Sequence, residues 1–186
     1  ILLMKKNILL LLFLIMPSVY SQPIVINELY NSGGNDEWLE LLVLQDSLDL
    51  RNWDIRDFSS SGSGQQPLVF SNNSLWSNIK KGTVIIIARP ENAFSEDLDP
   101  SDFLLIIKSS NALYFSGNVF LIAGSSEAVQ IRNTSQTHIF GVSWGSANLN
   151  SLPQPKVHLT GTSSSNTSVF FKEDSTPEII VAANWT

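Results

Sequence analysis

The chain has 186 residues, with 17 acidic and 11 basic side chains and a formal net charge of −6 at neutral pH. An acidic surface repels phosphate backbones and anionic lipid head groups, so we expect no nucleic-acid partner. Because the sequence contains no cysteine, disulfides, thiolate metal sites and cysteine nucleophiles are all excluded.

The N-terminal residues have the organisation of a secretory signal peptide. A basic stretch at residues 4–6 precedes an apolar run at residues 8–16, and Pro17 separates this run from small residues suited to signal peptidase. The run is about half the length of a membrane-spanning helix, which needs roughly 20 apolar residues. We therefore expect residues 1–21 to be a cleaved leader, with residues 1–3 an artefact upstream of the initiator methionine.

The mature chain is expected at residues 22–186, secreted or at the cell surface and without a membrane span. Removing the leader and its two lysines leaves 165 residues with a net charge of about −8. A chain of this length forms one domain that buries roughly 70% of its unfolded surface. The sequence ends soon after the last expected strand, which favours the first module of a longer protein with neighbouring domains.

From residue 22 onward, short runs rich in Ile, Val, Leu and Phe alternate with Ser, Asn, Gly, Asp and Pro, a pattern typical of strands and turns. No segment has the periodicity of a long amphipathic helix. Many short strands without helices predict an all-β sandwich or barrel. The expected strands are 24–30, 37–44, 48–58, 68–70, 83–89, 103–107, 119–123, 128–132, 138–144, 168–172 and 179–183.

The connections between these strands contain residues typical of turns. Residues 32–35 tolerate positive φ, which predicts that residues 24–44 form a hairpin. Pro153 and Pro155 are expected to keep residues 146–155 from joining the hydrogen-bonded ladder of a sheet. The long connections are expected at 59–66, at 90–102 with a single helical turn at 91–94, and at 146–155.

Two carboxylates in the first hairpin form a candidate pair. Alternate side chains of a strand share a face, so the apolar odd-numbered residues of 39–43 form one stripe and Glu40 points to the other side. Glu28 lies on the facing strand and is expected to approach Glu40. Such a pair suits a glycosidase at the right separation, but without a cleft we interpret both as structural acceptors for turn amides or for Arg51 and Arg56.

Residues 141–145, Gly-Val-Ser-Trp-Gly, match the G-x-S-x-G pattern in which a strained turn exposes a nucleophilic serine. The context differs, because helix breakers follow and no acidic residue lies between Ser143 and His158. We expect Ser143 on the surface of a strand, with a hydrolase as an alternative. His138 and His158 are too few for zinc in a chain without cysteine, and both are expected on strand surfaces.

The acidic loop at residues 96–102 is the one candidate for a metal, since calcium prefers clustered carboxylate and carbonyl oxygens. Its spacing differs from an EF-hand loop, which has glycine at the sixth position and no internal proline. A solvated loop is the expected reading, with Asp97, Asp99 and Asp102 as the ligands if calcium binds. No other cofactor is indicated.

Four aromatic residues suggest two different roles. Trp53 falls in an alternating strand and is expected in the core. Trp76, Tyr114 and Trp144 lie at strand ends or in loops, where an exposed ring stacks on a sugar or a partner protein. Packing beneath a loop is the usual fate of such rings, so we expect it for each of the three, with ligand binding as the alternative role.

Three segments resemble, in order and spacing, the opening of the lamin-tail domain family. They are Val-Ile-Asn-Glu-Leu at 25–29, Asp-Glu-Trp-Leu-Glu-Leu at 36–41, and Leu-Asp-Leu-Arg-Asn-Trp-Asp-Ile-Arg-Asp at 48–57. Weaker similarity extends the resemblance over most of residues 24–178. It implies an immunoglobulin-like β-sandwich that serves as a non-catalytic module in exported bacterial proteins. The residues expected to be structural are Glu28, Trp38, Glu40, Trp53 and Asp57.

These observations favour a non-catalytic interaction, adhesion or spacer module over an enzyme. The expected partner is another protein or a surface glycan. A carbohydrate-binding module and, less favoured, a secreted hydrolase are the alternatives.

Overall fold

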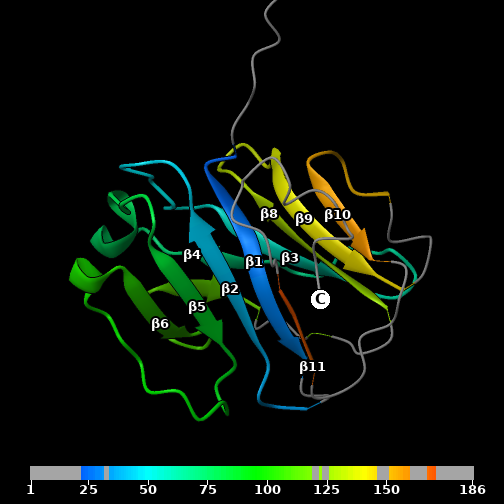
Figure 1. The fold of residues 1–186 in the computed structure, drawn as a ribbon, viewed down its shortest axis with the longest axis horizontal. Coiled ribbons are helices and arrows are strands. Elements are labelled where there is room, and N and C mark those ends of the chain that lie inside the picture. The colour runs from blue at the N-terminus through cyan, green and yellow to red at the C-terminus, as the bar shows by residue number, and fades with distance from the viewer. Residues whose placement is uncertain are drawn as a thin grey trace, which may run out of the picture.

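The computed structural model describes residues 22–31, 34–118, 122, 126–145, 151–159 and 167–170, the last of these as backbone. Two β-sheets pack against each other, and Figure 1 shows the five-stranded sheet in front of the six-stranded one. The predicted all-β sandwich is therefore confirmed. The expected leader at 1–21, the strand at 179–183 and most of the strand at 119–123 lie outside the described residues.

The five-stranded sheet contains the first hairpin. Its strands, in spatial order, are β11 (Thr167–Phe170), β1 (Ile24–Asn31), β2 (Trp38–Val43), β5 (Val84–Ala88) and β6 (Leu104–Lys108). β1 and β2 pair antiparallel, with Ile24 opposite Val43 and Tyr30 opposite Trp38, which confirms the predicted hairpin.

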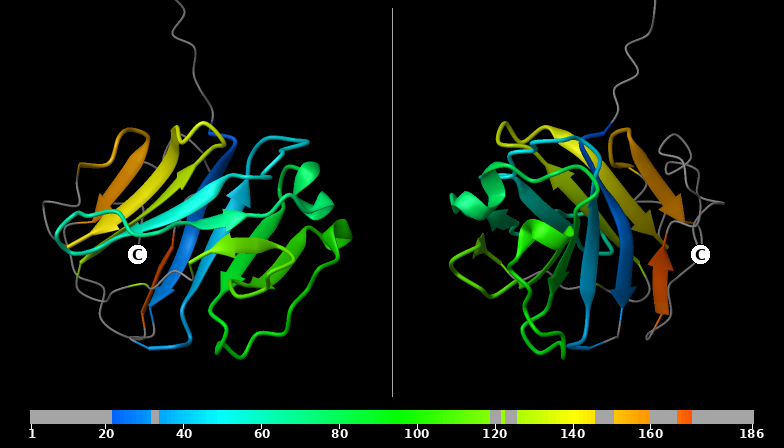
Figure 2. Two further views of the ribbon diagram at one scale, coloured as in Figure 1. Left: turned by 180° about the vertical axis from the view of Figure 1, so that it is seen from behind. Right: turned by 60° about the vertical axis from the view of Figure 1, so that its left-hand side comes forward.

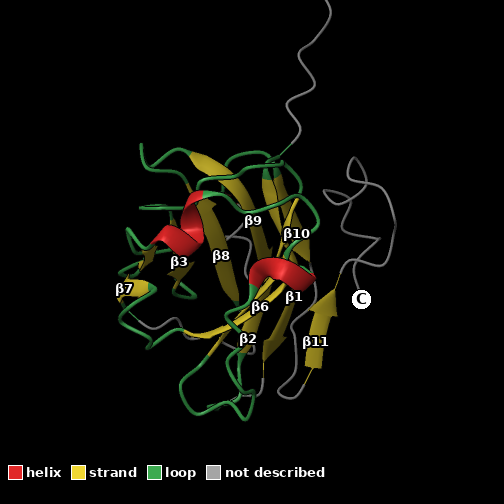
Figure 3. Ribbon diagram, turned by 90° about the vertical axis from the view of Figure 1, so that its left-hand side faces the viewer, coloured by secondary structure: helices red, strands yellow, loops and turns green. Residues whose placement is uncertain are grey.

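The six-stranded sheet lies behind and is seen from its outer side in the left panel of Figure 2. Its strands, in spatial order, are β10 (Lys156–Leu159), β9 (His138–Trp144), β8 (Glu127–Arg132), β3 (Asp54–Phe58), β4 (Leu68–Phe70) and β7 (Phe115–Gly117). The described helices, red in Figure 3, are the 3-10 turns η1 (Ser74–Ser77) and η2 (Pro100–Asp102). Among the described residues, no helix has the length and hydropathy needed to span a membrane.

Each sheet contains one parallel pair of neighbouring strands, β5 with β6 and β9 with β10. Adjacent parallel strands start at the same end of a sheet, so the chain must return between them through a crossover connection. Residues 89–103 make this return in the five-stranded sheet, and residues 151–155 are the described part of the connection that precedes β10 in the six-stranded sheet.

The core follows from alternation along the strands. In β2 the odd-numbered residues are fully buried and the even-numbered residues are partly exposed, and β5 and β6 show the same period of two. Successive side chains point to opposite faces of a sheet, so one face of each strand packs inward against the other sheet. The inward side chains at the centre of the core include Leu39, Leu41, Ile85, Ile87, Leu105, Ile107, Ile55, Val129, Ile131, Phe140 and Val142.

Most predicted strands are present within one or two residues of their expected ends, but the long strand at 48–58 is wrong in its first half. Asn52 has a φ of 62° and turns the chain, and only residues 54–58 join the sheet. Trp53, expected in the core, is partly buried and packs at its edge. Residues 91–94 form no helix, and β7 and β10 were not predicted.

Candidate functional site

Ser143 and His158 are brought together by the parallel pairing of β9 and β10. The register places Ser143 opposite His158, and the Ser143 Oγ lies 2.9 Å from the His158 Nδ1. Ser143 has 0% exposed surface, so the expectation of a strand-surface serine is wrong. The sequence motif thus marks a serine and histidine pair in which the serine is buried and the histidine is partly exposed.

The described end of the connection between β9 and β10 packs on the same side of the sheet as Ser143. Leu152 lies in that connection, is itself buried, and packs with Ala128 and Phe58 on the outer side of the six-stranded sheet. A Cβ atom built on Gly141 would lie only 2.7 Å from the Leu152 Cδ1. Leu152 therefore rests directly on the backbone of β9 at Gly141, two residues before Ser143.

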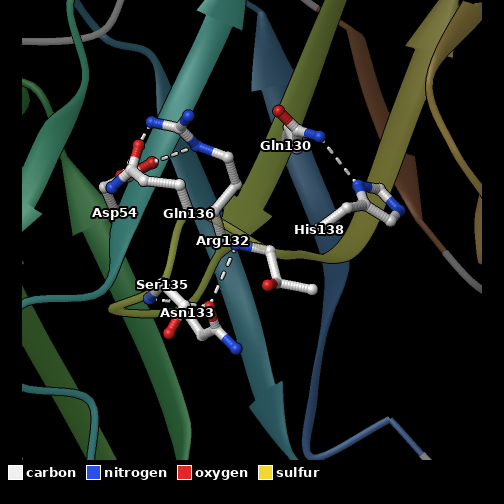
Figure 4. A network of polar contacts seen from close by, with 8 residues as sticks. Asp54, Gln130, Arg132, Asn133, Ser135, Gln136 and His138 are labelled. Atoms are coloured by element: carbon white, nitrogen blue, oxygen red, sulfur yellow. Dashed lines mark hydrogen bonds and ion pairs between the residues drawn. The ribbon is translucent and has the colours of Figure 1, made fainter.

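His138 fixes the end of the same connection. Its Nε2 lies 2.8 Å from the Pro155 carbonyl oxygen and its Nδ1 lies 2.9 Å from the Gln130 Nε2, the second contact being drawn in Figure 4. The carbonyl accepts only and the amide nitrogen donates only, so both contacts suit a neutral ring protonated on Nε2. His138 is half-buried and structural, whereas the sequence placed it on a strand surface.

These contacts do not assemble a hydrolytic site. A serine nucleophile needs an accessible Oγ, a base, and a third group that orients the base. The described residues supply the Oγ and the base, but no carboxylate that accepts a hydrogen bond from His158 and no access to the Oγ. The arrangement ties β10 to β9 instead.

Acidification is expected to weaken the fold through these two histidines. Burial, with a smaller contribution from Lys156, lowers the pKa of His138 and of His158 below the ordinary value of 6.5. A depressed histidine pKa gives stability that is present above pH 6.5 and is lost as the pH falls through the folded-state values. The free energy of unfolding in urea should therefore decrease from pH 7.5 towards pH 5.

A double variant, His138→Gln with His158→Gln, isolates this effect. Burial raises the pKa of Glu37, so protonation of Glu37 stabilises the fold as the pH falls, the opposite of the effect of the histidines. The pH dependence of the double variant must therefore be compared with that of the native protein. The double variant should lose stability less steeply over the same pH range. Equal slopes in the two proteins would show that the histidines titrate normally.

A methyl group at Gly141 is expected to destabilise the sandwich. Besides Leu152, the added Cβ would lie 3.3 Å from the Val129 carbonyl oxygen and from the His138 ring. Overpacking of this kind costs about 1–3 kcal/mol, so Gly141→Ala should lower the urea midpoint. In a Leu152→Ala background, Gly141→Ala should lower the free energy of unfolding by less. An equal loss in both backgrounds would mean that Leu152 does not rest on Gly141.

The aromatic residues chosen from the sequence build the core instead of a binding surface. Trp76 is 0% exposed and Trp144 is 1% exposed, so both rings are packed in the fold and neither is accessible to a ligand in this structure. The Trp76 Nε1 donates to the Tyr114 carbonyl oxygen at 2.9 Å, and the Tyr114 ring, partly buried, packs edge-on against Trp76 at 6.1 Å. Trp76 is the buried residue of η1 and belongs to the core cluster.

The acidic loop uses its carboxylates to hold its own backbone. The Asp97 Oδ1 accepts from the Asp99 amide, the Asp99 Oδ1 from the Ser101 amide, and the Asp102 Oδ1 from the Leu104 amide, at 2.9–3.1 Å. The hydrogen bonds from Ser101 lower the pKa of Asp99. Within the described part of the chain, no three acidic or histidine side chains are grouped so that they would hold a metal ion.

The paired glutamates lie where the sequence predicted. Glu28 and Glu40 are opposite each other in the register of β1 and β2, on the outer side of the five-stranded sheet. The Glu40 Oε1 accepts from the Asn27 Nδ2 at 2.6 Å. Arg51, expected to reach these carboxylates, pairs with Asp49 at 2.6 Å, because the turn at Asn52 keeps it away from the first hairpin.

Two buried ion pairs were not predicted. Arg132 binds Asp54 through Nε and Nη2, each at 2.8 Å, and the Gln136 Nε2 adds a third contact at 3.0 Å (Figure 4). Glu37 accepts from the Ile122 amide at 3.0 Å and lies 3.6 Å from Arg89. The partners of these contacts lie 52–85 residues apart in the chain, so the sequence does not show which residues pair. The signal that could have indicated a buried ion pair is an isolated charged residue within an expected apolar strand.

Asp57 and Trp38, which were also expected to be structural, lie on β3 and β2. Asp57 is buried in β3 opposite Val129, and Trp38 stacks against Tyr30 with ring centroids 6.0 Å apart. The comparisons with protein-family models, curated proteins and solved structures found no match. The similarity to the lamin-tail family therefore stays an expectation that depends on the sequence segments alone.

Proposed function

We propose that this chain is a non-catalytic interaction or spacer module, exported to the cell surface or the medium and of the lamin-tail type. The support is that the groups with possible chemistry are engaged within the fold. Ser143 carries most of the argument, because it occupies the nucleophile position of the G-x-S-x-G pattern and yet has 0% exposed surface. The acidic loop and the tryptophans of the sequence hypothesis are similarly used within the fold.

A module of this kind acts by positioning or by binding. Its partner is another protein or a surface glycan, and it works beside neighbouring domains of a longer exported chain. Sandwich folds host many unrelated functions, so the surface that binds must be argued from its own side chains.

Turnover measurements separate the module from the hydrolase and glycosidase alternatives. The purified chain is assayed on chromogenic ester and glycoside reporters, together with Ser143→Ala and Glu40→Gln. The proposal predicts rates equal to the reagent blank for all three proteins, with changes only in melting temperature. Turnover that Ser143→Ala or Glu40→Gln abolishes without altering the melting temperature would contradict the proposal and identify an enzyme.

A further inference from the structure

The outer face of the five-stranded sheet is apolar. Here "the outer face" means the partly exposed residues that alternate with the buried ones on β2, β5 and β6. The register joins them into two rows across the three strands. One row is Leu42, Val84 and Leu104, and the other is Glu40, Ile86 and Ile106. In Figure 1 this sheet faces the viewer, with no described strand or helix in front of these rows.

Aromatic side chains border the outer face at one end. There Trp38 packs between Tyr30, at 6.0 Å, and Phe94, at 6.1 Å between ring centroids. Phe94 is 39% exposed, although it is a large apolar side chain. At this end the apolar surface therefore extends beyond the strands themselves.

A sheet face in contact with water ordinarily carries polar residues in alternation with the buried apolar ones. The outer face instead carries five aliphatic side chains in its two rows, and contiguous apolar surface of this kind marks an interaction site. The single polar member of the rows is Glu40. The outer face is thus built as a binding surface with one charge in it.

The charge of the outer face is negative. Glu40 lies within the rows, and Glu28 is opposite it on β1. Lys108 is the cation on the same side of β6, and its ammonium group donates to the Asn92 carbonyl oxygen in the β5–β6 connection. A partner that complements this face therefore brings apolar side chains together with a basic one.

The size of the outer face limits the partner further. Three to four strands spaced about 4.8 Å apart, each about five residues long, span roughly 15 Å by 17 Å. This is about the footprint of three turns of an α-helix, whose diameter with side chains is about 10–12 Å. The area of the outer face is therefore well below the roughly 800 Å² that each partner contributes to a standard interface between folded proteins.

We propose that the outer face binds a short amphipathic segment of another protein, with an apolar side that covers Ile86 and Ile106 and a Lys or Arg that pairs with Glu40. This inference rests on the proposed interaction function and names its surface and partner. A second copy of the chain fits less well as the partner. If two outer faces packed together, Glu40 of each copy would lie against the acidic, apolar face of the other. Like charges within an interface oppose association.

Selection from a displayed library of random 12-residue peptides tests the inference with a defined probe. The bait is the purified chain, and selected peptides are measured by fluorescence anisotropy on the native protein and on variants. Ile86→Lys and Glu40→Lys are the test variants. Val69→Lys is the matched control, since Val69 is a partly exposed, β-branched residue in the middle of β4 in the other sheet. Thermal unfolding confirms that each variant folds.

The expected peptides carry apolar residues at helical spacing and at least one Lys or Arg. Ile86→Lys and Glu40→Lys should each weaken their binding by about tenfold or more, as for side chains at the centre of an interface, while Val69→Lys leaves binding unchanged. Glu40→Gln should fall between the native protein and Glu40→Lys.

Four outcomes would overturn the inference. The first is that no peptides are enriched, and the second is that the selected peptides bind Ile86→Lys and the native protein with equal affinity. The third is that soluble glycans displace the peptides. The fourth is that the protein forms a dimer in sedimentation equilibrium and that Ile86→Lys dissociates it. Peptides that bind elsewhere would leave the interaction function standing. Reporter turnover that depends on Ser143 would overturn the function whatever the peptides do, so the two failures are distinguishable.

Discussion

Replacing Asp54 with Ala is expected to lower the free energy of unfolding by about 3–5 kcal/mol, because it leaves a buried guanidinium without its counter-ion. The Asp54 side chain is 2% exposed and the Arg132 side chain 10%. Both oxygens of Asp54 accept from Arg132, and Gln136 donates to one of them. Urea unfolding followed by tryptophan fluorescence measures the loss.

The exposed pair of Asp49 and Arg51 is the matched control. These side chains are 47% and 38% exposed, and exposed pairs contribute about 0–1 kcal/mol, so Asp49→Ala should change stability little. A double variant, Asp54→Leu with Arg132→Leu, should recover much of the loss because no charge is then left buried. Equal small losses for Asp54→Ala and Asp49→Ala would show that the Arg132 pair is solvated.

Trp76→Ala is expected to lower the free energy of unfolding by about 3–5 kcal/mol, the range for removing a buried tryptophan. The ring packs against Phe70 at 4.9 Å and Phe115 at 5.6 Å between centroids, and its Nε1 donates to the Tyr114 carbonyl oxygen. Its loss leaves a cavity and removes one of the two hydrogen bonds to the Tyr114 carbonyl oxygen, which still accepts from the Ser71 amide. Thermal and urea unfolding should both show a strongly destabilised protein.

Leu113→Ala provides the comparison for Trp76→Ala, because Leu113 lies in the adjacent loop and is 69% exposed. Its replacement should leave the unfolding midpoint nearly unchanged. If Trp76→Ala instead kept the native melting temperature and removed binding to a glycan, Trp76 would be a ligand residue and its buried position would be contradicted.

The sequence predicted those parts of the fold that depend on local alternation. β1 and β2 alternate regularly around a turn rich in Ser, Gly and Asn, and both the hairpin and the opposition of Glu28 to Glu40 followed from this. The prediction failed at 48–53, where apolar residues continue but Asn52 takes a positive φ. Apolar content alone did not reveal that this segment bends towards η1, with Leu48 paired to Ile79.

The candidate sites were harder to predict because their environment is made by distant segments. Ser143 looked exposed on its own strand, but it is buried, because the sequence did not reveal that β10 pairs with β9 and brings His158 opposite it. Arg132 and Asp54 are 78 residues apart. Nothing in the local sequence of either residue specifies that β3 and β8 are neighbours.

The melting temperature of the purified chain with calcium, with EDTA and with soluble glycans tests most directly whether the acidic loop and the tryptophans serve the fold instead of a ligand. A ligand at about 100 times its Kd stabilises a protein by about 2.7 kcal/mol, which moves the midpoint of a domain of this size by several degrees. We expect one cooperative transition at the same temperature in all these solutions. A rise of several degrees with calcium that EDTA reverses, or with one glycan, would contradict this.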